Sequence, residues 1–304
     1  MTGDRIGVID LGSNTFHLLV CEIISENKWI EIHKEREYVK LASGGIDTIN
    51  EETEHRAIDA MTRFVGLIDK FEVKKTRAIG TAALRESSNG ISVAKKLEAI
   101  SGIPIEIIDG RLEAKYILAG IKAALPPLKE YGLIMDIGGG SVEFILFKES
   151  KVQFAESFKI GVAVLYRMFH TTDPMSAEQI DLLHQYLDKT LKPLFRALQN
   201  HTSYFLIGAS GSFEMLFDML LKKESGEHWA ELEMEGVIPY MKGVIHASLE
   251  ERRGMEEIPE ERLDYIVVAY LLIEYILTMA APSRLYYCEY ALKEGVISEM
   301  INEI

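Results

Sequence analysis

The sequence predicts an α/β protein made of two halves of similar build, each a sheet with helices packed on its faces. Short apolar runs typical of strands alternate along the chain with longer stretches whose apolar residues recur at helical spacing. Strands mixed with helices throughout a chain are typical of this class. In addition, one short motif occurs once in each half, and the pair Pro126-Pro127 lies between the two copies.

The repeated motif is an apolar run that ends in an aspartate and is followed by glycine and a hydroxyl residue. The first copy, IDLGSNTFHLLV, runs from Ile9 to Val20, and the second, MDIGGGSVEFIL, runs from Met135 to Leu146. Asp10 and Asp136 hold the same place in the two copies, 126 residues apart. Each copy is predicted to be a strand, a tight turn and a second strand, although either one alone is also typical of an ordinary hairpin.

In the first half, the motif predicts a hairpin of residues 6–9 and 16–24. A helix is expected over residues 51–70, because its apolar residues recur at helical spacing and its acidic first turn suits the helix dipole. Ser88 and Asn89 are typical N-cap residues for a helix that runs through Ala99. Further strands are expected at 29–34, 75–80 and, buried, at 103–109, and a helix at 113–124 ends before the two prolines.

The second half is predicted to open with the hairpin around Asp136 and a third strand at 151–157. Ser176 is expected to cap the helices within 177–199, which follow a short helix at 160–169. A buried strand at 204–207 leads through the glycine- and serine-rich loop 208–212 into a helix at 213–223. The remaining chain is expected to be helical over 224–257 and 262–279, with a loop and a final helix within 288–304.

Composition excludes several function classes. The formal charge of −14 argues against a broad electrostatic surface for nucleic acid or for anionic membranes. The two cysteines, Cys21 and Cys288, suggest a reducing compartment, and no metal-type spacing of Cys and His is present. The apolar stretch Ile266 to Pro282 contains Glu274 and is short for a membrane span, so it is expected to be a buried helix. With no signal peptide recognised at the start, a cytoplasmic protein is expected.

The glycines after the two aspartates predict phosphate-binding chemistry. Glycine can adopt positive φ, which lets several backbone N–H groups converge on one anion. An aspartate beside such a nest would repel a bare phosphate, and a divalent cation between them removes this conflict. Loop 208–212 offers a second kind of anion site, because helix N-terminal amides face a strand-to-helix turn. Its glycines are equally typical of tight helix–strand packing.

These motifs together resemble the exopolyphosphatase/guanosine pentaphosphate phosphohydrolase (Ppx/GppA) family of the actin-like ATPase superfamily. The resemblance covers essentially the whole chain, in the family's order. It is carried by the two aspartate motifs and by GTAALR at 80–85, EA at 113–114, GASGS at 208–212 and YALKEG at 290–295. One departure is Leu112, where the family often has a first glutamate before the one that Glu113 matches.

The resemblance implies two actin-like (ribonuclease H-like) domains with mixed sheets flanked by helices and an active site in the interdomain cleft. Because the family's C-terminal end packs on the first domain, the domains are expected to be 1–124 with 290–304, and 125–289. The chain resembles the short two-domain form, without the additional helical domain of long members.

The resemblance also implies a phosphoanhydride hydrolase that uses Mg²⁺ or another divalent cation. Glu113 matches the catalytic base, and Glu143 is expected to orient the water or to bind metal together with Asp10 and Asp136. Phosphate is expected to contact Gly12, Ser13, Asn14, Arg85, Gly138, Gly139, Gly140, Ser141, Gly208, Ser210, Gly211 and Ser212. The structural alternatives are a helix-start glutamate for Glu113, a solvent-facing strand residue for Glu143 and an ordinary surface arginine for Arg85.

The expected substrate is inorganic polyphosphate, guanosine pentaphosphate or both, with water activated by Glu113. An ATP-dependent kinase or ATPase of the same superfamily is an alternative, and a non-catalytic alarmone-binding sensor is another. Neither nucleic acid nor membrane is expected as a partner, and a homodimer is left open.

Overall fold

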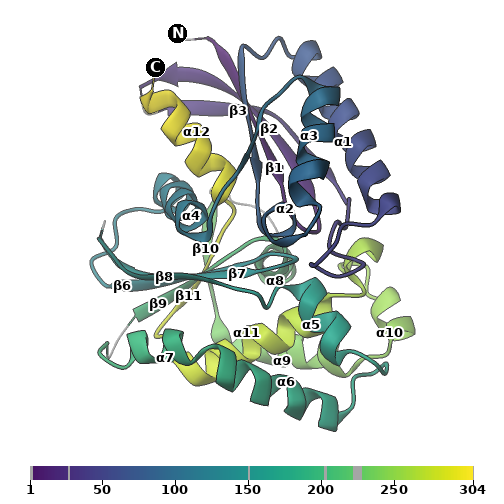
Figure 1. The fold of residues 1–304 in the computed structure, drawn as a ribbon. Helices are drawn as coiled ribbons and strands as arrows, with labels where there is room; N and C mark the ends of the chain where they lie inside the picture. The colour runs from purple at the N-terminus through teal and green to yellow at the C-terminus, as the bar shows by residue number, and fades with distance from the viewer. Residues whose placement is uncertain (1–2, 27, 150, 202–203, 222–227, 304) are drawn as a thin grey trace. The chain divides into compact units, whose positions relative to one another are not determined.

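The chain folds into two compact units. The computed structural model describes residues 3–26, 28–149, 151–201, 204–221 and 228–303 (Figure 1). The first unit comprises Met1–Ala123, Gly138–Gly140 and Ala291–Ile304, and the second comprises Ala124–Ile137 and Ser141–Tyr290. The predicted boundaries differ from this division chiefly in the loop Gly138–Gly140, whose contacts are with the first unit.

The first unit is built on a mixed sheet in the order β3-β2-β1-β4-β5. Strands β1, β2 and β3 form an antiparallel meander, whereas β4 and β5 run parallel to β1. The bounds are β1 Arg5–Leu11, β2 Phe16–Ser25, β3 Lys28–Glu37, β4 Lys75–Gly80 and β5 Ile105–Ile107. The strand predicted over 103–109 is therefore shorter, and it is an edge strand with half-buried and exposed residues rather than a buried one.

Helices cover both faces of this sheet. Helices α1 (Glu51–Lys70) and α3 (Gly90–Ser101) pack side by side on one face, and α12 (Leu292–Asn302) packs on β1 and β2 from the other (Figure 1). Two further helices are the short α2 (Ala82–Glu86) and α4 (Gly110–Ala124). Alternate residues of β1 and β2, such as Ile9 and Phe16, join Met61, Phe64 and Leu97 in one core.

The N-terminus of α3 is held differently from the prediction. The side chain of Asn89 does not cap the helix. It instead accepts a hydrogen bond from the Ile49 N–H at 2.9 Å and donates to the Ile49 carbonyl at 2.8 Å. Asn50, the next residue, is the N-cap of α1 and accepts from the Thr53 N–H. Asn89 thus joins the starts of the two helices that cover the sheet.

The second unit repeats the same plan with one more pairing. Its mixed sheet has the order β10-β11-β9-β6-β7-β8, in which β6, β7 and β8 form the antiparallel meander and β9 runs parallel to β6. The bounds are β6 Tyr131–Ile137, β7 Val142–Lys148, β8 Lys151–Phe158, β9 Tyr204–Ala209, β10 Trp229–Leu232 and β11 Leu285–Cys288. The prediction of two mixed sheets flanked by helices is confirmed.

Two strands of this sheet were not predicted. β10 falls where the sequence predicted helix, and β11 falls where no element was assigned. The helix predicted over 224–257 consists, within the described residues, of α9 (Met234–His246) and α10 (Leu249–Arg253); residues 224–227 lie outside the described part. The short β10 exists because it pairs antiparallel with β11, which itself pairs with β9.

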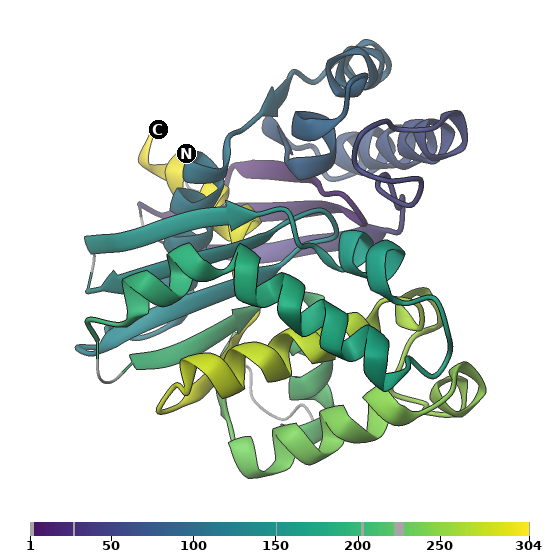
Figure 2. The same ribbon diagram turned by 60° about the horizontal axis from the view of Figure 1, so that its bottom comes forward.

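The helices of the second unit enclose the largest core. The remaining bounds are α5 Val162–Phe169, α6 Ala177–Thr190, α7 Lys192–Leu198, α8 Gly211–Leu221, the 3₁₀ turn Glu260–Arg262 and α11 Ile266–Ala280. Figures 1 and 2 show α6, α9 and α11 along one face of the sheet. Helix α11 is buried along almost its whole length, as its apolar sequence predicts. Within the described residues, no helix combines the length and apolar character needed to cross a membrane.

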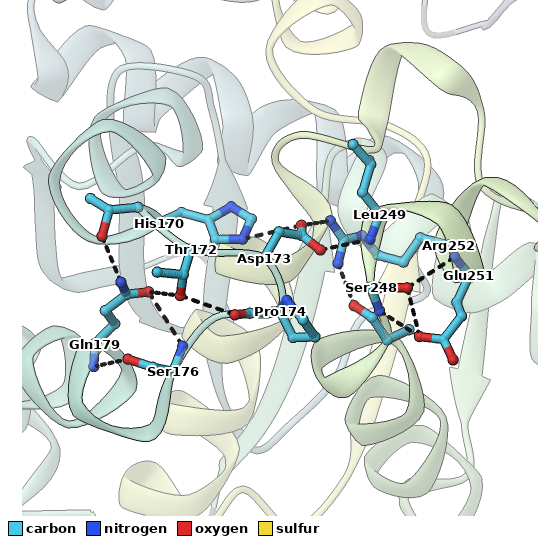
Figure 3. A network of polar contacts seen from close by, with 12 residues as sticks. His170, Thr172, Asp173, Pro174, Ser176, Gln179, Ser248, Leu249, Glu251 and Arg252 are labelled. Carbon is cyan, nitrogen blue, oxygen red and sulfur yellow. Dashed lines mark hydrogen bonds and ion pairs between the residues drawn. The ribbon is translucent and has the colours of Figure 1, made fainter.

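A polar network joins the loop between α5 and α6 to α10 (Figure 3). Arg252 is 1% exposed, and its guanidinium donates to Asp173 Oδ2 and to the Ala247 carbonyl. Asp173 Oδ1 accepts from the Leu249 N–H, and His170 Nε2 lies 3.7 Å from Asp173 Oδ2. Ser176 and Ser248 form capping boxes at the starts of α6 and α10. The predicted Ser176 cap is therefore present, within a network that binds two distant segments together.

The C-terminal helix α12 is fastened to the first unit by Glu299. Its carboxylate accepts hydrogen bonds from Lys115 Nζ at 2.7 Å, the Tyr116 hydroxyl at 2.5 Å and Arg77 Nη1 at 3.0 Å. Burial raises the pKa of Glu299, but these three donors outweigh it and lower the pKa from 4.5 to about 2. The ionised carboxylate therefore stabilises the folded state.

We expect Glu299→Gln to lower the free energy of unfolding at pH 7 by roughly 1–2 kcal/mol, a value reduced for solvent screening of this partly exposed group. Because the folded-state pKa lies below the unfolded one, the stabilisation is present above about pH 4.5 and is lost as the pH falls towards about 2. Urea unfolding of both proteins between these pH values measures it. Glu303→Gln, which loses one contact to Lys75, is the control. A stability difference that did not shrink on acidification would contradict the assignment.

Candidate active site

The two aspartate motifs form hairpins with the same register. Asp10 of β1 lies opposite His17 of β2, and Asp136 of β6 lies opposite Glu143 of β7. The internal repeat seen in the sequence is thus a repeat of backbone pairing, in which His17 holds the position that Glu143 holds in the second unit. Residues opposite each other on neighbouring strands share one face of the sheet.

Strand alternation places these polar residues on the sheet face away from the main cores. Ile9 and Leu11 contribute to the core under α1 and α3, so Asp10 between them faces the other way. In the second unit, Met135 and Ile137 belong to the core, and Asp136 therefore points to the opposite face. Both aspartates are half-buried at the ends of their strands.

The loop Gly138–Gly140 packs directly on the first hairpin. A Cβ on Gly139 would lie 2.8 Å from Asn14 Cβ and 3.0 Å from the Asn14 nitrogen. A Cβ on Gly140 would lie 2.7 Å from Ser13 Oγ. Glycine is needed at both positions because only its bare backbone allows this approach. The structure thus brings together two of the predicted phosphate-binding segments, Gly12–Asn14 and Gly138–Gly140.

Ser13 also connects this pair of loops to α2. Its buried hydroxyl accepts a hydrogen bond from the Ala83 N–H at 3.0 Å, in the first turn of α2. The same short helix carries Arg85, whose side chain is 18% exposed and is therefore not an ordinary surface arginine. A hydroxyl that accepts from a backbone amide still has its own hydrogen to donate to a phosphate oxygen.

Arg85 and Glu113 form a buried ion pair. Arg85 Nη1 lies 2.8 Å from Glu113 Oε2 and also donates to the Ile108 carbonyl at 2.9 Å. Glu113 is 5% exposed in the first turn of α4. Asp109 caps this helix, since its Oδ1 accepts from the Arg111 and Leu112 N–H groups. The predicted base is thus held by its helix and by the side chain predicted to bind phosphate.

In the second unit, Glu143 is not a solvent-facing strand residue. It is 2% exposed, and its Oε1 accepts hydrogen bonds from the hydroxyls of Ser141 and Ser157, each at 2.7 Å. Ser157 lies opposite Glu143 on β8. Two hydroxyl donors on one oxygen fix the orientation of this carboxylate. Ser157 was not predicted as a site residue, and only the pairing of β7 with β8 identifies it.

The third loop is explained by packing within the second unit. A Cβ on Gly208 would lie 2.1 Å from the Phe213 ring, and a Cβ on Gly211 would lie 2.0 Å from the Arg262 guanidinium. Ser210, at φ +77°, accepts from the Ile137 N–H through its hydroxyl. Arg262 also lies 3.3 Å from Glu214 in the first turn of α8. Phosphate binding by Gly208, Ser210, Gly211 and Ser212 stays a prediction, and Arg262 was missed by sequence reasoning.

The carboxylates near the two hairpin turns fit a hard cation that keeps water and phosphate oxygens as most of its ligands. Within the part of the chain that the structure describes, no group of three or more His, Cys, Asp or Glu residues is arranged as a metal cage. Mg²⁺ is usually held by one or two carboxylates plus substrate phosphates, so a cage is not required. Asp136 and Glu143, opposite each other on β6 and β7, offer oxygen ligands of this kind in the second unit. Asp10 offers such a ligand in the first unit.

Comparison with known proteins decides the family. The model of the Ppx/GppA phosphatase family matches residues 22–304. The chain belongs to the Ppx/GppA phosphatase family. A crystal structure of an exopolyphosphatase from Cytophaga hutchinsonii is 34% identical, with a TM-score of 0.94 and 99% of both chains covered. This Ppx/GppA protein is therefore an enzyme of the phosphatase class of hydrolases.

More distant members show the shared fold and a difference in length. The structure of the Aquifex aeolicus PPX-GPPA enzyme is 22% identical, with a TM-score of 0.79 over 97% of this chain and 99% of that one, and it has the same fold. A guanosine-5′-triphosphate,3′-diphosphate pyrophosphatase from Vibrio parahaemolyticus is 26% identical over 306 residues. That match spans 97% of this Ppx/GppA chain but only 59% of the Vibrio protein.

Proposed function

We propose that this Ppx/GppA protein hydrolyses phosphoanhydride bonds, releasing terminal phosphate from inorganic polyphosphate, from the 5′ end of guanosine pentaphosphate, or from both. The observation that carries the proposal is the buried Glu113 carboxylate. Arg85 holds this carboxylate by a hydrogen bond. Arg85 lies in α2, whose Ala83 N–H donates to the Ser13 hydroxyl, and the loop around Ser13 packs against Gly139 and Gly140. A positioned base and a phosphate-binding backbone loop are two requirements of such a hydrolysis.

In the proposed reaction, Glu113 takes a proton from a water molecule while the oxygen of that water attacks the terminal phosphorus. The phosphoanhydride bond to the bridging oxygen breaks, so the products are orthophosphate and a chain shorter by one phosphate. Gly12, Ser13, Asn14, Gly138, Gly139 and Gly140 would donate amide and hydroxyl hydrogens to the phosphate oxygens. Ser141 lies in the same hairpin, where its hydroxyl holds Glu143.

Asp10, Asp136 and Glu143 would hold a divalent cation, most simply Mg²⁺. When bound, that cation would neutralise phosphate charge that the carboxylates would otherwise repel. Family phosphatases are generally dependent on divalent metal, which supports this part of the proposal. The hydroxyls of Ser141 and Ser157 would keep Glu143 correctly oriented as a ligand or as an acceptor for bound water.

Sequence similarity favours polyphosphate as the first substrate to test. The exopolyphosphatase from Cytophaga hutchinsonii is 34% identical to this chain, whereas the Vibrio pyrophosphatase is 26% identical. The net charge of −14 offers little general attraction for long polyanions. We therefore propose that the protein recognises the terminal phosphates of the polyphosphate locally, rather than binding a long stretch of it through an extended charged surface.

A phosphate-release panel tests the proposal. The protein is incubated with Mg²⁺ and with polyphosphates of several lengths, guanosine pentaphosphate or ATP, and orthophosphate is measured over time. We expect release from polyphosphate, from guanosine pentaphosphate or from both, and little from ATP. Release from ATP alone would favour the ATPase alternative. Binding of guanosine pentaphosphate without release from any substrate would favour the sensor.

A further inference from the structure

Arg85 makes its described contacts with two carboxylates and one backbone carbonyl, and one of the carboxylates is the proposed base. Nε lies 3.2 Å from Glu86 Oε1, while Nη1 contacts both the Ile108 carbonyl and Glu113 Oε2 at 2.9 and 2.8 Å. The side chains of Glu86 and Glu113, taken without their backbone atoms, are 23% and 7% exposed. A guanidinium used in this way holds a side chain in place, which differs from the phosphate contact predicted from sequence.

The helices that carry Arg85 and Glu113 are each held by a side chain near their first turn. The Ser13 hydroxyl anchors the first turn of α2, and Asp109 caps α4 just before Glu113. The Ile108 carbonyl, which shares Nη1 with Glu113, lies next to Asp109 in the chain. Arg85 therefore connects two fixed segments, α2 and the start of α4. The first of them, α2, is hydrogen-bonded to Ser13 of the proposed phosphate-binding loop.

We propose that Arg85 is a positioning residue, which aims the Glu113 carboxylate at the attacking water by holding its Oε2. This inference rests on the proposed function, in which Glu113 is the base. A glutamate side chain rotates about three bonds, and an anchored Oε2 restricts the directions in which Oε1 can point. Through Ser13 and α2, the position of Arg85 is also tied to the loop that would bind phosphate.

The positioning role and the phosphate-ligand role predict different kinetics. A residue that aims the base acts on the chemical step, so its loss lowers kcat and leaves KM nearly unchanged. A residue that binds phosphate equally in the ground state and the transition state raises KM when it is removed. A positioning residue also has no further effect once Glu113 itself is lost.

The experiment is a double-mutant cycle of Arg85→Gln and Glu113→Gln in the full chain, assayed by phosphate release from the best substrate of the panel. We expect Arg85→Gln to lower kcat by about 10²-fold, the order of loss that follows a misplacement of about 1 Å, with KM changed by less than about threefold. In the Glu113→Gln background, Arg85→Gln should cause no further loss. Added guanidinium should restore part of the kcat of Arg85→Ala, and should not restore Glu113→Gln.

Arg77→Gln is the matched control, because Arg77 is another largely buried, carboxylate-bound arginine of the same unit, joined to Glu106 and Glu299. Its loss should lower thermal stability without changing kcat or responding to guanidinium. Thermal unfolding is recorded for every variant, and if Arg85→Gln does not fold, Arg85→Lys and guanidinium rescue of Arg85→Ala carry the test.

Two results would overturn the positioning role: a rise in KM with unchanged kcat, or an equal loss of kcat in the presence and absence of Glu113. Full activity of Glu113→Gln alone is a separate result, which would remove Glu113 as the base and defeat the proposed mechanism itself.

Discussion

Glu113→Gln is expected to lower the rate of phosphate release by about 10²–10⁴-fold, the usual range for the loss of a general base, while substrate still binds. Glutamine has nearly the same shape as glutamate, and its carbonyl oxygen can still accept the hydrogen bond from Arg85 Nη1. The fold around α4 should therefore be preserved. What is lost is the ability to take a proton from water at neutral pH.

Turnover is measured by orthophosphate release at saturating substrate, and binding by calorimetry with the same substrate. The control is Glu106→Gln, because Glu106 is also bound to an arginine of the first unit but lies at the exposed edge strand β5. We expect its kcat to stay within about twofold of the unchanged protein. Undiminished turnover in Glu113→Gln would exclude this residue as the base.

The repeat of the aspartate motif predicted more of the site than any single residue did. Equal spacing in the two copies predicted equal hairpins, and the hairpins place Glu143 opposite Asp136 as the pattern requires. The strong strand and helix patterns around them were also readable, because alternation and helical spacing are local properties of the sequence. These local signals were sufficient to predict each of the two hairpins, β1 with β2 and β6 with β7.

The features that sequence reasoning missed all depend on distant pairing. Ser157 reaches Glu143 only because β8 pairs with β7 in one register, and Arg262 covers Gly211 from 51 residues further along the chain. Strands β10 and β11 have four residues each, too few for a clear alternation, and they are defined by pairing with each other and with β9. Asn89 likewise was expected to cap its own helix and instead binds Ile49.

Gly295→Ala is expected to destabilise the first unit by about 3 kcal/mol, near the upper end for an added methyl group in a tightly packed contact. A Cβ at this position would lie 1.9 Å from the Tyr116 carbonyl oxygen and 2.6 Å from its carbon, both in the backbone of α4. A Cβ on Gly120 of α4 would likewise lie 1.9 Å from the Ala291 carbonyl oxygen. The two helices touch backbone to backbone, so no side chain can rotate away and α12 must move.

Thermal unfolding measures the effect, and we expect the transition of the first unit to occur roughly 5–10 °C earlier. Gly66→Ala is the matched control, since Gly66 lies in the exposed part of α1 and a Cβ there meets nothing within 4 Å. A helix interior prefers alanine to glycine, so this control should gain about 0.5–1 kcal/mol. Opposite signs for the same chemical change would show that contact with α4, rather than helix propensity, requires glycine at position 295. Equal gains in both variants would mean that α12 does not pack on α4 as described.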